Sequence, residues 1–449
     1  MKKIIIASTL MVLACSVFAL QNAEELFVPS KHAEQGTPIT IEEAVQIALD
    51  NNTTIKDAVK NRDIYRAQVK EFRSYMFPTL SVSGTYTYNN ERQAAFFNGA
   101  KMEMGSDNSL AVGADANWVL WSGGKIRSGY TIAKKTEASA EFSLQSVRDQ
   151  IEKEVTSMCY AIILSNAVAR VQQGHLDIAN QTLKEMKLKY DQGLSSNLDL
   201  LSQEVTVANI EPLVIQAHNT FEVGNLQLKK LLNKDPEDEV YLAWDVAMDV
   251  PEVKDLAQLY DLAAESRPDL RAAALRVEIT KKDITLARSE HFPQLIAFAN
   301  KYYNGQSDGV WPDNTENYWS SAFGLKMNFP LFEGFRVNSV VQQKKLAYEQ
   351  AQQDYDYMKR EVRISIKSAW LNFGEAKKRM ASGDTVIKQS KQNLDSMTKR
   401  YRAGLASRLE LDDAVVALTN AQLQYVQAVH DAFNALADLR FSVGYEVKI

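Results

Sequence analysis

One short segment occurs twice in the chain, and this duplication limits the folds that the chain can adopt. Residues 190–200 read YDQGLSSNLDL and residues 401–411 read YRAGLASRLEL, which is an offset of 211 residues from Gly193 to Gly404. A repeat that spans most of a 449-residue chain predicts one structure built from two similar halves.

Each copy of the repeated segment follows a very long stretch without proline, residues 125–190 and residues 336–401. Uninterrupted helices of this length would extend on the order of 100 Å, which is far more than a globular domain needs. Their apolar residues alternate steps of four and three, which is typical of coiled coils. Returning helices are expected at residues 197–232, with a kink at Pro212, and through residues 411–443.

Two predicted β-hairpins precede these long helices. Residues 80–88 and 110–120, joined by a polar segment, alternate apolar with small polar side chains. Residues 294–303 and 319–329 do the same in the second half, and aromatic residues lie near the strand ends. A soluble amphipathic sheet would show this alternation too, but the pattern also matches a transmembrane barrel with a wet lumen. Four strands are too few to close a barrel, so the barrel must be shared between chains.

Shorter helices are expected before each hairpin. A capping box formed by Thr40 and Glu43 predicts a helix that starts near Ile41. A second helix, at about residues 55–76, should end before Pro78. The corresponding helices of the second half are expected at residues 256–265 and 270–289.

The amino terminus has the form of an export signal. Two lysines, an apolar run and Ala19 predict cleavage after residue 19, although Cys15 leaves lipoprotein processing as an alternative. With residues 1–19 removed, the mature chain keeps only Cys159, which excludes an intramolecular disulfide and a cysteine-cluster metal site. The predicted organisation is a signal (1–19), a polar leader (20–39), a first repeat (40–233), an acidic linker (234–255) and a second repeat (256–449).

Other function classes find little support in the composition and motifs. The net charge of −5 does not favour nucleic acid as a partner. The five histidines lie singly, and no phosphate-binding glycine loop is present. The sequence therefore predicts a protein that is not an enzyme and that needs no cofactor or metal.

The ordered set of motifs resembles the TolC-type outer-membrane efflux proteins, the outer membrane factor family, over nearly the whole mature chain. The motifs are the Phe-Pro strand entries at Phe77 and Phe292, the glycine breaks at Gly123 and Gly334, and the two Tyr-x-x-Gly-Leu-x-Ser turns. The resemblance implies an α+β membrane protein. Three chains would form a 12-stranded transmembrane β-barrel, with four strands from each chain, continuous with an α-helical coiled-coil barrel that crosses the periplasm.

The resemblance also implies partners and sites. The partners would be a periplasmic adaptor (a membrane fusion protein) and an inner-membrane pump of the RND, ABC or MFS type. The residues that match the adaptor-docking turns are Gly193, Leu194, Ser196, Gly404, Leu405 and Ser407. The residues that match the constriction at the periplasmic tip are Asp199, Tyr401, Glu410 and Asp413. Inward carboxylates would form acidic rings in a trimer, which favour cations, whereas acids at helix starts can also simply complement the helix dipole.

One departure from the family pattern concerns the gate. The family places an arginine two residues after the glycine of the second turn, where this chain has Ala406, so the family's closed-state salt bridge does not carry over directly. Arg402 and Arg408 flank the position. A periplasmic coiled-coil scaffold or adaptor and a porin without a pump are the alternative functions, and the sequence does not reveal the cargo.

Overall fold

The computed structural model describes residues 26–28, 37–244, 250–309 and 317–445. The predicted export signal and Cys15 lie outside these residues. The chain divides into two compact units: residues 58–144 with 268–358, and the remaining residues, which include 145–267 and 359 onward.

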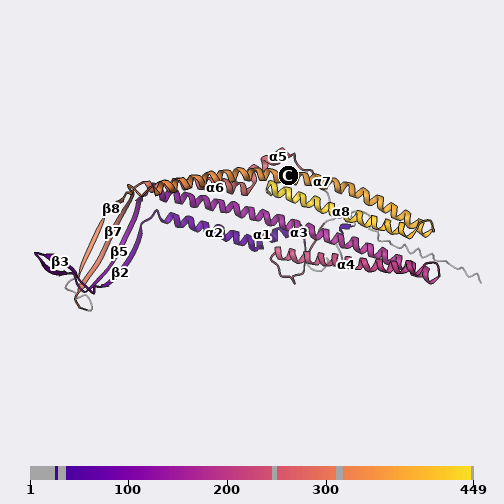
Figure 1. The fold of residues 1–449 in the computed structure, drawn as a ribbon, viewed down its shortest axis with the longest axis horizontal. Coiled ribbons are helices and arrows are strands. Elements are labelled where there is room, and N and C mark those ends of the chain that lie inside the picture. The colour runs from indigo at the N-terminus through magenta and orange to yellow at the C-terminus, as the bar shows by residue number, and fades with distance from the viewer. Residues whose placement is uncertain (1–25, 29–36, 245–249, 310–316, 446–449) are drawn as a thin grey trace, which may run out of the picture. The chain divides into compact units, whose positions relative to one another are not determined.

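The first of these units contains the predicted strands. β2 (Thr79–Tyr88), β5 (Asn108–Trp121), β7 (Gln294–Ser307) and β8 (Tyr318–Asn328) form one antiparallel sheet in the order β2-β5-β7-β8, as Figure 1 shows. Both predicted hairpins are confirmed, and β5 and β7 join the two halves of the chain. Among the described strands, β2 and β8 each have one unpaired edge.

One face of this sheet is apolar and uncovered. Leu80, Val82 and Phe323 are 78%, 77% and 89% exposed. The register aligns these side chains with those of Val112, Trp118 and Leu325 on one face, because alternate residues of paired strands share a face. An exposed apolar band of this kind is expected where a sheet meets lipid.

The segment between β2 and β5, which the sequence predicts to be a polar connection, contains a hairpin of its own. β3 (Gln93–Phe97) pairs with β4 (Ala100–Met104) through a turn in which both Asn98 and Gly99 have positive φ, 49° and 80°. Asn-Gly is a strong signal for a two-residue hairpin turn. The prediction of a plain polar loop was therefore wrong.

Long helices account for most of the remaining chain. α3 (Lys125–Asp191) and α7 (Arg336–Arg402) each contain 67 residues, which corresponds to about 100 Å. They return as α4 (Asn197–Leu231) and α8 (Arg408–Val443). The predicted helices are confirmed, and α4 remains helical on both sides of Pro212.

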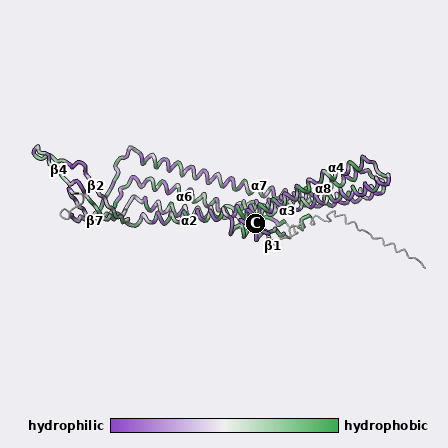
Figure 2. The backbone as a smooth tube through the Cα atoms, turned by 90° about the horizontal axis from the view of Figure 1, so that it is seen from below, coloured by the Kyte–Doolittle hydropathy of each residue, from purple (hydrophilic) through white to green (hydrophobic). Residues whose placement is uncertain are grey.

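The predicted seven-residue periodicity corresponds to the buried side of these helices. Val155, Ile162, Ile366 and Leu439 are at most 1% exposed. Figure 2 shows apolar and polar residues alternating along these helices, as expected for helices that each bury a stripe. The coiled-coil spacing was therefore a reliable guide to the core.

Short elements complete the two units. α1 (Ile41–Asn51) begins with the predicted capping box of Thr40 and Glu43, and α2 (Thr53–Ser74) follows. α5 (Leu256–Ser266) and α6 (Pro268–Arg288) precede β7, with a single 3-10 turn, η3 (Ser289–His291), between α6 and the strand. β1 (Thr37–Ile39) pairs in parallel with β6 (Val240–Leu242), which ties the predicted leader to the predicted linker. None of the described helices has the length and apolar composition of a membrane-spanning helix.

Candidate functional site

The two repeated turns have the same backbone structure. Gly193 and Gly404 adopt φ values of 74° and 73°, a left-handed conformation that glycine adopts without strain. The amide of the next residue, Leu194 or Leu405, donates to the carbonyl five residues earlier, at 2.8 Å in both turns. This pattern is a Schellman motif, which ends a helix and satisfies its last carbonyls.

Each turn then starts the returning helix with a serine cap. The hydroxyl of Ser196 accepts from the Asp199 amide at 3.1 Å, and that of Ser407 accepts from the Glu410 amide at 3.3 Å. The repeated motif thus encodes a complete helix-to-helix turn: a glycine that stops one helix and a serine that starts the next.

Four leucines on the two turns are uncovered. Leu194 and Leu405 are 72% and 71% exposed, and Leu198 and Leu409, in the first turns of α4 and α8, are 75% and 69% exposed. They occupy equivalent positions in the two repeats, and Leu198 and Leu409 are the second residues of their helices. Uncovered apolar side chains that cluster on a surface often mark an interaction site.

Arg408 connects the two repeats at the turns. Its guanidinium donates to the Asp199 carbonyl oxygen at 2.6 Å and to Oε1 of Gln203 at 2.9 Å, both on α4. It also donates to Asp412 on its own helix at 3.2 Å. The Arg408 side chain is only 15% exposed. Gln203 is 2% exposed and is itself fixed by a hydrogen bond to the carbonyl of Ala179 on α3.

Two further contacts link the ends of α3 and α7. Arg402 forms an ion pair with Glu185 at 3.2 Å, and the ammonium of Lys189 lies 4.7 Å from the centre of the Tyr401 ring. These four side chains line a cavity of about 440 Å³. The family resemblance implies that Tyr401 lies at the constriction and is positioned to hydrogen-bond across the tip. In the described structure its ring contacts Lys189 and the Leu411 cluster, and its hydroxyl has no hydrogen-bond partner.

Two of the predicted constriction acids cap their own helices. Glu410 accepts from the Ser407 amide at 2.6 Å and from its hydroxyl at 2.9 Å, and the backbone hydrogen bond lowers the pKa of Glu410. Asp199 accepts from the Ser196 hydroxyl at 2.6 Å. Carboxylates at these positions stabilise helix starts, which is the alternative that the sequence left open.

The remaining acids of the second turn differ from each other. Asp412 is half-buried against Arg408, and burial raises its pKa while Arg408 acts in the opposite direction. Asp413 is exposed and has no hydrogen bond or ion pair with any described residue. Of the predicted constriction acids, Asp413 is therefore the one whose carboxylate is free to face an ion.

The described structure thus brings both predicted turns together on one unit and adds residues that sequence reasoning missed. Arg408 was noted only as a neighbour of Ala406, and Gln203 was not singled out at all. The signal for Gln203 was a polar residue on the buried stripe of α4, beside Val207 and Ile210. Among the described residues, no group of three His, Cys, Asp or Glu side chains could hold a metal ion.

Comparison with known proteins points to a single family. The profile of the family described as "Outer membrane efflux protein" matches residues 44–234 and 259–445. The chain is 19% identical to the outer membrane protein TolC of Salmonella enteritidis over 400 residues, which cover 88% of this chain and 79% of TolC. It is 26% identical over 405 residues to TtgC, a probable efflux pump outer membrane protein of Pseudomonas putida, covering 85% and 78% of the two chains.

A solved structure shows the same fold. The Campylobacter jejuni CmeC outer membrane channel superposes with a TM-score of 0.77 at 17% identity, covering 94% of this chain and 91% of CmeC. The family match includes both repeats and both turns. The chain therefore belongs to the outer membrane efflux protein family.

Proposed function

We propose that three copies of this chain form an exit duct through the outer membrane. In this proposal a periplasmic adaptor and an inner-membrane pump deliver the cargo to the duct. The observation that carries the proposal is the four-stranded sheet with an exposed apolar face and an unpaired edge on each of β2 and β8. Lipid contains no groups that could satisfy open strand edges, so the edges must pair with other copies. Three copies supply twelve strands, which is enough to close a barrel.

The surface of α4 supports the same assembly. One stripe of α4, which includes Gln203, Val207 and Ile210, is buried within the chain. A second apolar stripe, Leu201, Val205 and Ile215, is 53–70% exposed and lies on the opposite side of the helix at the spacing of a coiled coil. A helix with apolar stripes on two opposite sides fits a closed ring of helices, in which each helix packs against two neighbours.

This assembly can be tested on the second stripe of α4. The purified protein in mild detergent should have the mass of three copies and should conduct ions in a planar bilayer. Leu201→Lys combined with Ile215→Lys should reduce the trimer fraction strongly, because burying two unpaired charges costs several kcal/mol. Thr220→Lys changes an exposed residue on a different side of α4 and serves as the control. Recovery of the unmodified chain as a soluble monomer from the periplasm would refute the duct.

The two turns support adaptor docking and a gate at the periplasmic end. The four exposed leucines offer an apolar surface to an adaptor hairpin. The gate would be held closed by Arg408, whose hydrogen bonds join α8 to α4. Separation of these two helices at the turns would widen the duct, and it requires that these hydrogen bonds break.

The ion selectivity of the duct should depend mainly on Asp413. In a trimer its free carboxylate becomes a ring of three charges, which attracts cations. Asp413→Asn should therefore lower the cation-over-anion permeability ratio by a factor of about three or more, measured as a reversal-potential shift in a salt gradient. Glu410→Gln should change selectivity less, because that carboxylate caps α8, and should instead weaken the start of the helix. Equal selectivity changes in the two variants would show that Asp413 contributes no more to ion selectivity than Glu410 does.

A further inference from the structure

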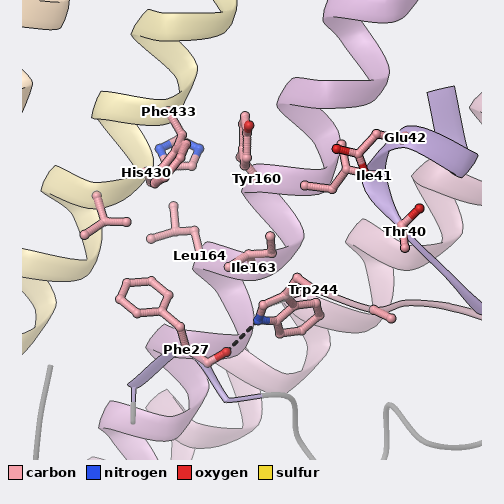
Figure 3. Close-up of a pocket in the computed structure, with 12 residues that line it drawn as sticks. Phe27, Thr40, Ile41, Glu42, Tyr160, Ile163, Leu164, Trp244, His430 and Phe433 are labelled. Carbon is pink, nitrogen blue, oxygen red and sulfur yellow. Dashed lines mark hydrogen bonds between the residues drawn. The ribbon is translucent and has the colours of Figure 1, made fainter. Parts of the chain in front are cut away.

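A second cavity lies in the unit that contains the turns, formed by α1, α3, α8 and the segments around Phe27 and Trp244. Its volume is about 340 Å³. Figure 3 shows Phe27 and Trp244 on one side of the cavity and Tyr160, Phe433 and His430 on the other, with Ile163 and Leu164 between them. None of these residues belongs to the two turns, to the four exposed leucines or to the residues that contact Arg408.

The walls of this cavity are rich in aromatic rings that are held in place. The rings of Tyr160 and Phe433 lie 5.2 Å apart, and the indole nitrogen of Trp244 donates to the Phe27 carbonyl at 2.5 Å. Phe27 is 2% exposed. The faces of such rings carry a partial negative charge and attract cations, most strongly in tryptophan.

Among the described residues that line the cavity, Glu42 has the only carboxylate, and no described group pairs with it. Glu42 lies in the first turn of α1, next to Glu43. The carboxylate of Glu43 accepts a hydrogen bond from the Thr40 amide in the capping box. In contrast, Glu42 accepts no hydrogen bond from any described residue and forms no ion pair with one. Figure 3 shows its side chain at the rim, with the carboxylate turned toward Tyr160.

No described cation neutralises Glu42 from within the cavity. Lysine and arginine are absent from the lining residues. His430 also lines the cavity, but one of its ring nitrogens lies 2.7 Å from the Asn434 side-chain amide. Arg440 acts on Tyr160 electrostatically without lining the cavity.

We infer that this cavity binds a lipophilic organic cation. Three partly exposed aromatic side chains, from Tyr160, Trp244 and Phe433, provide apolar contact and cation–π attraction, and Glu42 supplies the opposite charge. A neutral or anionic molecule of the same shape would gain the apolar contact but not the electrostatic attraction. The inference concerns one chain and requires neither the trimer nor the gate.

The experiment uses two ions of the same shape and opposite charge, tetraphenylphosphonium and tetraphenylborate. Binding of each to the purified full chain is measured by equilibrium dialysis, with the detergent alone as the blank. Tetraphenylphosphonium should bind saturably and tetraphenylborate should not. Glu42→Gln should weaken tetraphenylphosphonium binding about tenfold. Asp50→Asn, on the same helix but outside the lining, is the matched control and should bind like the unmodified chain.

A second variant tests the aromatic part of the site. Trp244→Leu should also weaken tetraphenylphosphonium binding, and its thermal unfolding is recorded so that a loss of fold is recognised. Glu42→Gln changes an exposed side chain and keeps the fold, so its result decides the inference even if Trp244→Leu unfolds. Equal binding of the two ions, or unchanged binding in Glu42→Gln, would overturn the inference.

Discussion

Arg408→Ala should open the duct at rest and raise its conductance in planar bilayers. The substitution removes the hydrogen bonds from α8 to the Asp199 carbonyl and to Gln203, at 2.6 and 2.9 Å. The donor is charged and mostly buried, so the loss should cost the closed state about 2 kcal/mol. A change of that size shifts the ratio of closed to open duct about 30-fold toward the open form. The measurement is single-channel conductance of the purified trimer without adaptor.

Two control variants separate the Arg408 contacts from charge in general. Arg408→Lys keeps the charge but not the forked donor geometry, so it should have an intermediate effect. Arg402→Ala removes an ion pair with Glu185 in which both side chains are at least 40% exposed, and exposed pairs contribute little. Conductance in Arg408→Ala equal to that of the unmodified duct, or a larger effect in Arg402→Ala, would show that Arg408 does not hold the gate.

The order of helices and strands could be predicted because each element has a periodic pattern of apolar residues. Steps of three and four along residues 125–190 and 336–401 identify helices, and alternation along residues 80–88 and 294–303 identifies strands. The repetition of both patterns at a nearly constant offset made each weak local signal much stronger. Glycine and serine at fixed positions then defined the turns, because each supplies a specific backbone conformation or cap.

The contacts between the repeats could not be predicted, because no periodic pattern encodes them. Ala406 occupies the position at which the family resemblance places an arginine, and Arg408 lies on the first turn of α8. Whether a long arginine side chain reaches the neighbouring helix depends on how α4 and α8 lie together. Its contact with Gln203 joins residues 205 positions apart in the chain. Only the three-dimensional structure shows that Arg408 reaches α4.

The roles of the acids were uncertain for a related reason. Asp199, Glu410 and Asp413 are equally acidic in the sequence, and each lies near the start of a helix. The structure distinguishes their roles. The carboxylates of Asp199 and Glu410 accept hydrogen bonds from the capping serines, whereas Asp413 is exposed. The β3–β4 hairpin was missed because polar residues flank it on both sides and masked its short apolar run.

Leu194→Ala combined with Leu405→Ala should abolish most of the transport activity of the duct in cells. These side chains are 72% and 71% exposed on the two turns, and no described residue covers them. Burial of one leucine at a protein interface is worth about 2 kcal/mol, so loss of both at three copies should weaken adaptor binding by orders of magnitude. The measurement is the susceptibility of cells to a substrate of the cognate pump, together with crosslinking of the adaptor from Ser196→Cys.

The matched control lies in the same turn. Ser195→Ala shortens a side chain next to Leu194 without removing apolar surface and should leave transport unchanged. Conductance of the purified double variant should also be unchanged, because neither leucine contributes to the Arg408 contacts. The two predictions therefore separate docking from gating: the leucine variant loses transport but keeps a closed pore, whereas Arg408→Ala opens the pore. Normal transport in the leucine variant would place adaptor docking elsewhere on the protein.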